Sequence, residues 1–408
     1  MAAHPTDRTT CCIVGGGPAG AMLGLLLARA GVDVTVLEKH DDFFRDFRGD
    51  TIHASTLQVI EELGLAQQFL QLPHQVATQL EAVVGGERIV VADFTVLGGP
   101  HSHVLIMPQW DFLDFVTSEA GRHAGFRLLM GAEATDIIRE GERVAGVLFR
   151  HNGETRVIRS KLTVACDGRH STLRERAGLE PREFGAPMDV LWFRLPRKPD
   201  DPAGTGARIE AGVMLVLINR GEYWQAAYVI SKGGFERVRG EGLDALRSSV
   251  GKLASFLDEP RLDAIATWDD VKMLRVQVNR LRRWSQPGLL FLGDAAHAMS
   301  PIGGVGINLA IQDAVAAANI LAEPLRTGAA TETHLARVQS RRWFPTVATQ
   351  ALQRVAQRRV IGSILAGDKA IRPPAWLPKV LGLKPVRRAV ARTIAIGIRP
   401  EHVAPDIR

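Results

Sequence analysis

The stretch that decides the fold is residues 289–310, which read LLFLGDAAHAMSPIGGVGINLA. Residues 289–292 are all apolar, which is typical of a strand covered on both faces of a parallel sheet. Gly293 removes a side chain where a ligand can approach the backbone, and Asp294 adds a carboxylate at the strand's carboxyl end. Because open α/β sheets bind their ligands at that edge, the stretch predicts a ligand site.

The residues after this strand predict a loop with outward-facing amides. Pro301, Gly303, Gly304 and Gly306 leave the loop backbone free to turn, and a long helix is expected over about 308–323. The amino terminus of a helix carries unpaired N–H groups and the positive end of the helix dipole. Together they suit a flat anion close to the backbone. The alternative, an ordinary helix start, is disfavoured because the other end of the chain supplies a matching motif.

The matching motif lies near the amino terminus. An apolar strand over 9–14 ends at GGGPAG, residues 15–20, and apolar residues at helical spacing follow until Gly31. A second strand then ends at Glu38. Strand, glycine turn, helix, strand and acidic residue make a complete dinucleotide-binding unit, in which the pyrophosphate meets the helix amino terminus. Glu38 is expected to accept hydrogen bonds from both ribose hydroxyls of an adenosine.

A third motif lies between these two. Residues 162–166 form an apolar strand that runs into Asp167-Gly168, so a carboxylate again stands at the carboxyl end of a strand, before an expected helix. Residues 181–284 differ in character, because β-like runs alternate there with Pro/Gly-rich turns. They predict a second domain, inserted between two halves of a nucleotide-binding domain.

The composition is that of a soluble globular enzyme with two domains. The chain has 408 residues, 46% hydrophobic and 23% charged, with a net charge of +6. No Lys/Arg run with interleaved aromatics predicts a nucleic-acid partner, and the positive charge would attract an anionic cofactor. Cys11, Cys12 and Cys166 fall in predicted buried strands, which suits a reduced cytoplasm, and no metal-ligand spacing is found.

The two ends of the chain carry separate expectations. No long apolar segment follows a basic start, so we expect no signal peptide and a cytoplasmic protein. Residues 371–408 are rich in Arg, Pro and apolar residues, and a basic amphipathic helix there could lie weakly on an anionic membrane surface. The alternative, which we favour, is a closing helix packed on the nucleotide-binding domain. The sequence leaves open whether the protein is a monomer or a homodimer.

The three motifs stand in order and together resemble the class A flavoprotein monooxygenases, the para-hydroxybenzoate hydroxylase-like family. The resemblance spans about residues 9–325. It implies an α/β fold with a Rossmann-like FAD-binding domain, an inserted β-sheet-rich substrate domain and a C-terminal helical segment. The implied division assigns 9–72, 109–180 and 285–325 to the FAD-binding domain, 73–108 and 181–284 to the substrate domain, and 326–408 to the C-terminal helical segment.

The resemblance also implies which residues hold FAD. In that family the first motif holds the ADP half, the Asp-Gly motif supports the pyrophosphate and is implicated in the use of NAD(P)H, and the Gly-Asp motif binds the ribityl chain. Residues 301–308 resemble the loop whose amides face the pyrimidine edge of the flavin, although Val305 replaces a residue that is often polar. The expected FAD-binding residues are Gly15, Gly17, Pro18, Ala19, Gly20, Glu38, Lys39, Arg48, Gln109, Ala134, Asp167, Gly293, Asp294, Pro301, Gly304, Val305, Gly306, Ile307 and Asn308.

The implied reaction is hydroxylation of an aromatic or similarly electron-rich, largely apolar substrate. NAD(P)H reduces the flavin, O₂ adds at flavin C4a, and the substrate attacks the resulting hydroperoxide, while the protein orients the reactants and excludes water. The substrate is expected between the inserted domain and the flavin. Its candidate contacts are His103, Trp192, Met214, Val216, Trp224 and Tyr228. No catalytic base is predicted, because a lone histidine is more often structural.

Two other functions are compatible with parts of the pattern. A flavin-dependent reductase of an isoprenoid-type substrate would fit an apolar pocket. A non-enzymatic lipid-binding protein like the Rab GDP-dissociation inhibitors would share the fold, but Glu38, Asp167 and Asp294 all stand at ligand-facing positions and argue against it. The Trp-x-Trp-x-Ile-Pro motif of flavin-dependent halogenases is absent from the sequence.

Overall fold

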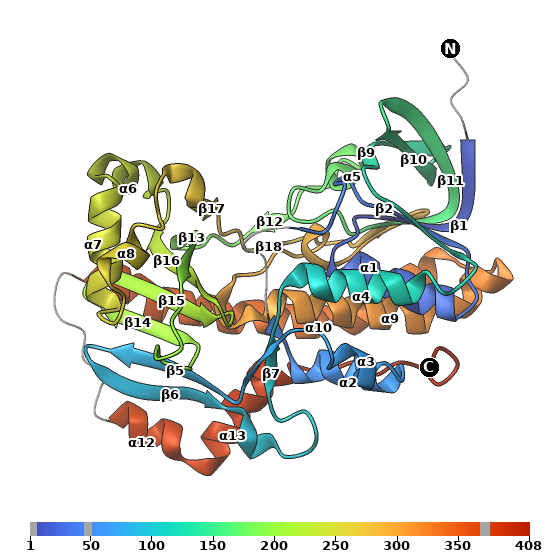
Figure 1. Ribbon diagram of the computed structural model, residues 1–408. Helices are drawn as coiled ribbons and strands as arrows, with labels where there is room; N and C mark the ends of the chain where they lie inside the picture. The colour runs from blue at the N-terminus through green and yellow to red at the C-terminus, as the bar shows by residue number, and fades with distance from the viewer. Residues whose placement is uncertain (1–5, 45–50, 368–375) are drawn as a thin grey trace.

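Two β-sheets lie at opposite ends of the molecule, and long helices run between them (Figure 1). The structure is a computed structural model that describes residues 6–44, 51–367 and 376–408. Both sheets contain segments that lie far apart in the sequence, because the chain passes between the two ends of the molecule several times.

The first sheet has eight strands and carries all three sequence motifs. Its main path runs β19-β20-β11-β1-β2-β8, and β10 joins β11 to β9. The strands β1, β2, β8, β11 and β20 pair in parallel, so their carboxyl ends meet at one edge. The strand bounds are β1 (Thr6–Val14), β2 (Val34–Leu37), β8 (Phe126–Leu129), β9 (Glu133–Glu140), β10 (Arg143–His151), β11 (Glu154–Ala165), β19 (Ser285–Gln286) and β20 (Leu289–Phe291).

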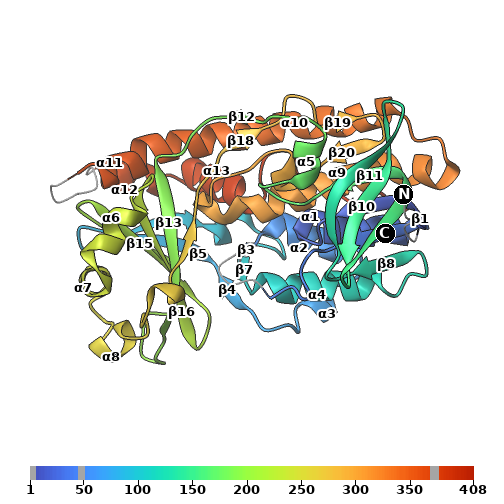
Figure 2. The same cartoon turned by 90° about the horizontal axis from the view of Figure 1, so that it is seen from above.

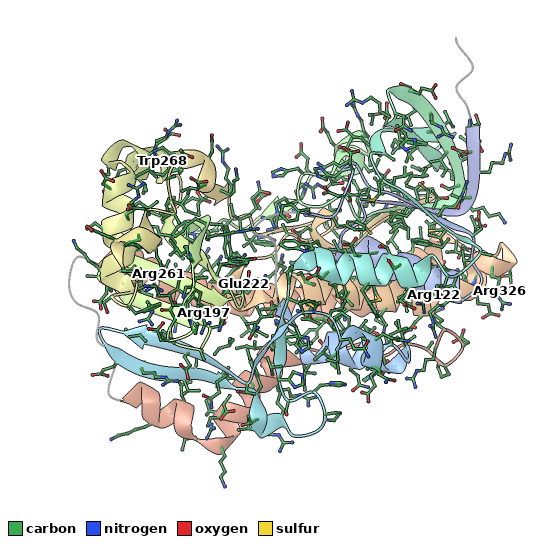
Figure 3. All side chains as sticks on the ribbon, viewed as in Figure 1. Arg122, Arg197, Glu222, Arg261, Trp268 and Arg326 are labelled. Atoms are coloured by element: carbon green, nitrogen blue, oxygen red, sulfur yellow. The ribbon has the colours of Figure 1, made fainter. Side chains whose placement is uncertain are left out.

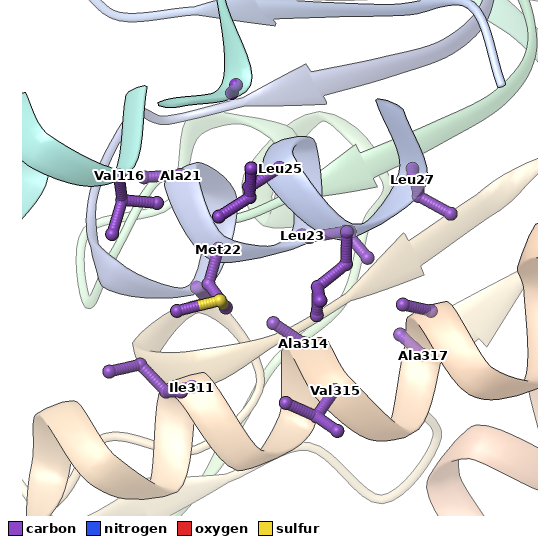
Figure 4. Packing of buried hydrophobic residues seen from close by; sticks show 14 of the residues in the cluster. Ala21, Met22, Leu23, Leu25, Leu27, Val116, Ile311, Ala314, Val315 and Ala317 are labelled. Carbon is purple, nitrogen blue, oxygen red and sulfur yellow. The ribbon is translucent and has the colours of Figure 1, made fainter. Parts of the chain in front are cut away.

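Helix α1 (Pro18–Arg29) forms the centre of the core beside this sheet. It packs against α4 (Gln109–Ala120) and α9 (Val305–Thr327), and its residues from Ala19 to Ala28 are buried. Figure 4 shows Met22 and Leu23 of α1 facing the α9 side chains around Ile311 and Ala314. The many alanines of α9 allow the two helices to approach closely, which holds the starts of both helices beside the sheet edge.

Helix α9 is also largely buried in the core of the protein. Among the described residues, the stretch 302–327 is the one helix long and apolar enough to cross a membrane, and 72% of its most apolar 18-residue window is buried inside the protein. Its apolar character is therefore explained by packing against α1 and α10 (Glu332–Ala356).

The second sheet has seven strands in the order β17-β13-β16-β15-β14-β5-β6. Neighbours are antiparallel except β14 and β5, which pair in parallel. Helices α6 (Phe235–Glu241), α7 (Leu243–Leu253) and α8 (Glu259–Leu262) cover one face. Figure 3 shows Arg261 and Trp268 on this helical side. The strand bounds are β5 (Gln79–Val84), β6 (Glu87–Asp93), β13 (Met188–Pro196), β14 (Gly206–Glu210), β15 (Val213–Asn219), β16 (Tyr223–Ser231) and β17 (Lys272–Leu274).

Smaller elements join the two sheets. A three-stranded sheet contains β3 (Thr51–Ile52), β7 (Val104–Ile106) and β4 (Gln75–Ala77), and a two-stranded ribbon pairs β12 (Arg182–Glu183) with β18 (Asn279–Arg280). The remaining short helices are α2 (Ala54–Glu62), α3 (Ala66–Phe69), α5 (Thr172–Arg176), η1 (Phe94–Leu97), η2 (Trp268–Asp270), η3 (Gly293–Ala295) and η4 (Ile302–Gly304).

The carboxyl-terminal segment is helical and packs on the protein. After α10 come η5 (Gln357–Ile361), α11 (Gly362–Leu365), α12 (Trp376–Gly382) and α13 (Lys384–Ala395). The apolar side of α13, with Ala391 and Ile394, packs on β6 and η1, and Arg387 pairs with Asp93. The expected closing helix, α13, docks on the edge of the second sheet, and the residues after it, with Val403 and Ile407, pack into the core around α1 and α9.

Several element boundaries differ from the expectations. The apolar strand expected over 162–166 is the end of a longer strand, β11, whose pairing with β10 and with β1 overlaps along its length. The helix expected over about 308–323 begins earlier, because α9 starts at Val305. The α/β fold class is confirmed. The division into domains stays a prediction.

Candidate active site

The first glycine turn leaves no room for side chains. Gly15 has φ +103°, and a Cβ there would lie 2.3 Å from the carbonyl oxygen of Cys166. A Cβ on Gly20 would lie 1.9 Å from the carbonyl oxygen of Gly15. The chain therefore needs glycine at both positions. Gly17 precedes α1, and no side chain caps the helix, so the first amides of α1 stay available to an anion.

Glu38 lies beside this turn. Its Oε2 accepts a hydrogen bond from the Gly16 N–H at 2.9 Å, and its Oε1 accepts one from the His40 N–H at 3.1 Å. The carboxylate stands at the end of β2, as expected. It also fixes the glycine turn, and the sequence did not predict this second role. A carboxylate can accept about four hydrogen bonds, so capacity for ribose hydroxyls remains.

The Asp-Gly motif is tied to helix α5. Asp167 Oδ2 accepts from the Leu173 N–H at 3.0 Å, and Ser171 caps the helix by accepting from the Arg174 N–H at 3.0 Å. Burial raises the pKa of the Asp167 carboxyl, although hydrogen bonds from Ser171 and Leu173 and the charge of Arg174 oppose the rise.

The Gly-Asp turn brings all three motifs together. A Cβ on Gly293, which has φ +57°, would lie 3.2 Å from the Cβ of Ala310 and 3.4 Å from the Cβ of Ala19. The turn therefore touches the starts of both long helices. Asp294 Oδ2 pairs with Arg169 Nη2 at 3.1 Å, which links it to the Asp-Gly motif.

Arg174 strengthens the link between the second and third motifs. Its Nη1 donates to the carbonyl of Ala295 at 2.9 Å and its Nη2 donates to the carbonyl of Arg169 at 2.6 Å. One guanidinium thus donates to a carbonyl in each of the two loops, and this pair of bonds fixes the position of the loops relative to each other.

A buried ion network lies beneath the Gly-Asp turn, and the sequence did not predict it. Asp313 of α9 accepts from His297 Nε2 at 2.6 Å and from Arg342 Nε of α10 at 2.9 Å, and all three side chains are buried. Burial alone would raise the pKa of Asp313, but the charges of His297 and Arg342 hold it below its usual value. Asp313 also accepts from the Gly293 N–H at 3.3 Å, so the network supports the turn.

The loop at 301–308 takes a left-handed backbone at two glycines and is held in place by hydrogen bonds. Gly303 and Gly304 have φ of +76° and +63°, which favours glycine. Thr51 Oγ1 donates to the Gly304 carbonyl at 3.1 Å. The side chain of Asn308 is buried and accepts from the His53 N–H at 3.0 Å and the Thr56 hydroxyl at 2.6 Å, so it anchors β3 and α2 to α9.

The second sheet divides the predicted substrate residues between its two faces. Trp192, Met214 and Val216 lie on the face that also contacts Ile302 of the loop. Trp224 and Tyr228 lie on the opposite face, under α7 and α8.

These two side chains are hydrogen-bonded on the helical side of the sheet, away from the loop, and their contact with a substrate stays a prediction. The indole Nε1 of Trp224 donates to Asp201 Oδ2 at 2.9 Å, and Arg261 Nη1 contacts both oxygens of that carboxylate at 2.8 and 2.7 Å. The hydroxyl of Tyr228 is 2.9 Å from that of Ser249 on α7. The physical reason is alternation along strands, which sends neighbouring side chains to opposite faces.

The remaining expected site residues are more scattered. Gln109 is buried at the start of α4, Ala134 is buried in β9, and Lys39 is exposed after β2. His103 precedes β7, where burial and the nearby His101 and His74 lower its pKa. Arg48 lies outside the described residues.

A cavity of about 430 Å³ opens beside the Asp-Gly motif. Arg169, His170 and Arg174 line it from the motif and α5, and Gln277 and Asn279 line it from the segment around β18. Because Arg169 also pairs with Asp294, the cavity adjoins the place where the motifs meet. Among the described residues, no group of three or more His, Cys, Asp or Glu could hold a metal ion.

These features fit the binding of FAD. The glycine cradle at Gly15 and Gly20 and the uncapped start of α1 suit a pyrophosphate, with Glu38 on the adenosine side. Asp294 stands where it would meet the ribityl chain. The glycine-rich loop at the start of α9 would present backbone amides to the flavin ring.

Comparisons with known proteins agree with this geometry. Residues 8–355 match the model of the FAD binding domain family. The chain is 31% identical over 420 residues to 6-methylpretetramide 4-monooxygenase of Streptomyces rimosus, covering 100% of this chain and 98% of that protein. Two solved structures show the same fold. One is p-nitrophenol 4-monooxygenase PnpA from Pseudomonas putida DLL-E4, with a TM-score of 0.77 and 19% identity over 97% of this chain and 100% of that chain. The other is PqsL from P. aeruginosa in complex with 2-aminobenzoylacetate, with a TM-score of 0.74 and 21% identity over 94% of this chain and 99% of that chain.

Proposed function

Because the chain belongs to the FAD-binding domain family and is an FAD-dependent aromatic monooxygenase, we propose that it hydroxylates an apolar aromatic substrate held against its second sheet. The observation that carries the proposal is one apolar cluster. In it, Trp192, Met214 and Val216 of the second sheet pack with Ile302 of the loop at the start of α9. A substrate beside these residues would lie next to the flavin ring.

The cofactor assignments follow from the same geometry. We assign the adenosine side of FAD to Glu38, the pyrophosphate to residues 15–20 and Asp167, the ribityl chain to Asp294, and the flavin ring to residues 301–308. Bound FAD supplies the redox chemistry, in which NAD(P)H provides the electrons and one atom of O₂ enters the substrate. The positively charged start of α9 would stabilise negative charge on the reduced ring.

The protein's part in the reaction is binding, orientation and exclusion of water. The cluster around Ile302 is apolar throughout, and Leu365 of α11 and Leu381 of α12 also pack against it. These carboxyl-terminal helices would close the substrate site from the solvent. The proposal assigns no proton transfer to the protein.

The cavity beside Arg169 and His170 is our candidate for the approach of the nicotinamide coenzyme. It adjoins Asp294, and two arginines stand in its lining together with three glutamates, so the choice rests on its position rather than on its charge.

The test is substrate-stimulated oxidation of NADH and NADPH by the purified yellow protein. The panel begins with 6-methylpretetramide and p-nitrophenol, which name two of the similar enzymes, and with 2-aminobenzoylacetate, which is bound in the PqsL structure; ¹⁸O₂ reports oxygen transfer to the product. A variant, Met214→Trp, would fill the proposed site and should abolish stimulation while FAD stays bound. Its control, Tyr228→Phe, changes the opposite face of the sheet and should leave stimulation intact. Stimulation unaffected by Met214→Trp would contradict the placement.

The isoprenoid reductase and the non-enzymatic lipid-binding protein are not favoured. A similar monooxygenase is 31% identical over the whole chain, whereas a similar reductase, digeranylgeranylglycerophospholipid reductase 2 of Methanococcoides burtonii, is 25% identical over 79% of it. We further propose the domain division given above, a cytoplasmic location, and a monomer or homodimer. For residues 376–408 we propose a closing role rather than weak membrane contact. The support is the packing of α13 on β6, which turns its apolar residues away from solvent.

A further inference from the structure

Helix α10 has an unusual distribution of polar residues. Gln350 and Gln353 of α10 and Gln357, the first residue of η5 that continues it, are buried, whereas Leu352 and Val355 on the other side are exposed. The three glutamines stand three and four residues apart and therefore share one face of the helix. A buried amide is costly unless it is hydrogen-bonded, so these side chains need partners.

Most of their partners lie in the segment 298–302, which leads to the flavin loop. Gln353 Nε2 donates to the carbonyls of Ser300 and Ile302, both at 3.0 Å, and its Oε1 accepts from the Ser300 N–H at 3.2 Å. Gln357 Nε2 donates to the Ser300 hydroxyl at 2.8 Å. Gln350 Nε2 donates to the carbonyls of Asn279 and Ala298 at 2.7 and 3.1 Å.

Gln353 makes the contacts that bear most directly on the loop. Its one amide holds Ser300 by both backbone groups and holds Ile302 as well, on either side of Pro301. On the other side of the loop, Thr51 holds Gly304. Figure 2 shows α10 extending from the second sheet along β18 toward the first sheet, so it forms a rigid support behind the loop.

We propose that Gln353, assisted by Gln357, is a positioning residue that sets where the loop at 301–308 presents its amides to the flavin ring. The inference rests on the proposed placement of the ring at this loop. Gly303 and Gly304 make the loop backbone permissive, so its geometry must be imposed from outside. Amide donors stabilise charge only when they are held at the right place beforehand.

The experiment compares Gln353→Ala with a matched control on the same helix. Gln339 makes the same kind of clamp, because its Oε1 accepts from the Trp284 N–H at 2.9 Å and its Nε2 donates to the Arg282 carbonyl at 2.8 Å. That contact lies ahead of β19, away from the loop. Thermal unfolding of the apoproteins, the Kd for FAD, the visible spectrum and the reduction potential of bound FAD are measured for both variants.

We expect both variants to lose thermal stability, but only Gln353→Ala to alter the flavin. Its Kd for FAD should rise about tenfold, its absorption spectrum should change, and its potential should become more negative because the loop amides stabilise the reduced ring less well. Gln339→Ala should change the Kd by less than about twofold.

Equal flavin properties in the two variants would overturn the inference. If Gln353→Ala does not purify, Gln357→Ala removes a single contact with the Ser300 hydroxyl and should change the spectrum in the same direction, and a wild-type spectrum would refute the role. A wild-type protein that binds no FAD would instead contradict the proposed function, which separates the two failures.

Discussion

The substitution His53→Gln should make the stability of this protein less sensitive to acid. His53 precedes α2, is buried, and its Nδ1 lies 2.6 Å from the Ile394 carbonyl of α13. The neutral imidazole can donate this bond from Nδ1, and it joins the closing helix to the nucleotide-binding side of the molecule. Burial lowers the pKa of His53 from 6.5 to about 4, and the bond to Ile394 opposes the shift only in part.

The size of the effect follows from linkage. Above pH 6.5 the imidazole is neutral in both the folded and the unfolded states, so the group has no pH-dependent effect. Between pH 6.5 and about 4 the unfolded state binds a proton that the folded state does not, so stability falls as the pH falls. Each pKa unit corresponds to about 1.36 kcal/mol, which gives a total loss of about 3 kcal/mol.

The assay is urea unfolding of the wild type, His53→Gln and His74→Gln at several values between pH 7 and pH 4.5. His74 is the matched control, because its Nδ1 lies 2.7 Å from the Leu72 carbonyl but the side chain is only half-buried. The wild type should lose its advantage over His53→Gln as the pH falls, whereas the difference between the wild type and His74→Gln should change little. A pH-independent difference between the wild type and His53→Gln would refute the reasoning.

Three further predictions concern the cofactor and the carboxyl terminus. Glu38→Ala should weaken FAD binding by about 1–3 kcal/mol, because the ribose loses its charged partner and the glycine turn loses a contact; FAD titration with full wild-type affinity would contradict this. Asp294→Ala should lower flavin occupancy of the purified protein with little change in its circular dichroism, and insolubility even in excess FAD would point to a structural role. The full chain should stay in the supernatant when it is centrifuged with anionic liposomes at low salt, and sedimentation with them would support membrane contact instead. Removal of residues 384–408 should lower the thermal stability, because it uncovers β6.

The sequence alone identified the three cofactor motifs because each depends on local rules. Gly15 and Gly20 are required where a Cβ would collide with a neighbouring backbone, so a short glycine pattern reports the turn itself. Glu38 and Asp294 follow apolar strands, and the ends of parallel strands lie at one edge of a sheet. The order of the motifs then indicated the family, and with it the fold.

The sequence did not decide which side of the second sheet faces the flavin loop. Alternation groups Trp192 with Met214 and Val216, and separates them from Trp224 and Tyr228, but both faces of this sheet are apolar. The choice was made by α6, α7 and α8, which cover one face and leave the other to Ile302. Packing between distant segments of the chain carries that information, and periodicity within one strand does not.

The tertiary structure likewise decided which buried polar side chains hold the flavin loop and the Gly-Asp turn in place. In the sequence, the glutamines at the end of α10 look like an ordinary solvated helix face, and Asp313 stands within a largely apolar core helix. Their partners are backbone groups and side chains from other segments, such as Ser300 for Gln353 and Arg342 for Asp313. A polar side chain becomes stable in the interior only when folding delivers a hydrogen-bonding partner, so its role is set by tertiary contacts rather than by its own position in the sequence.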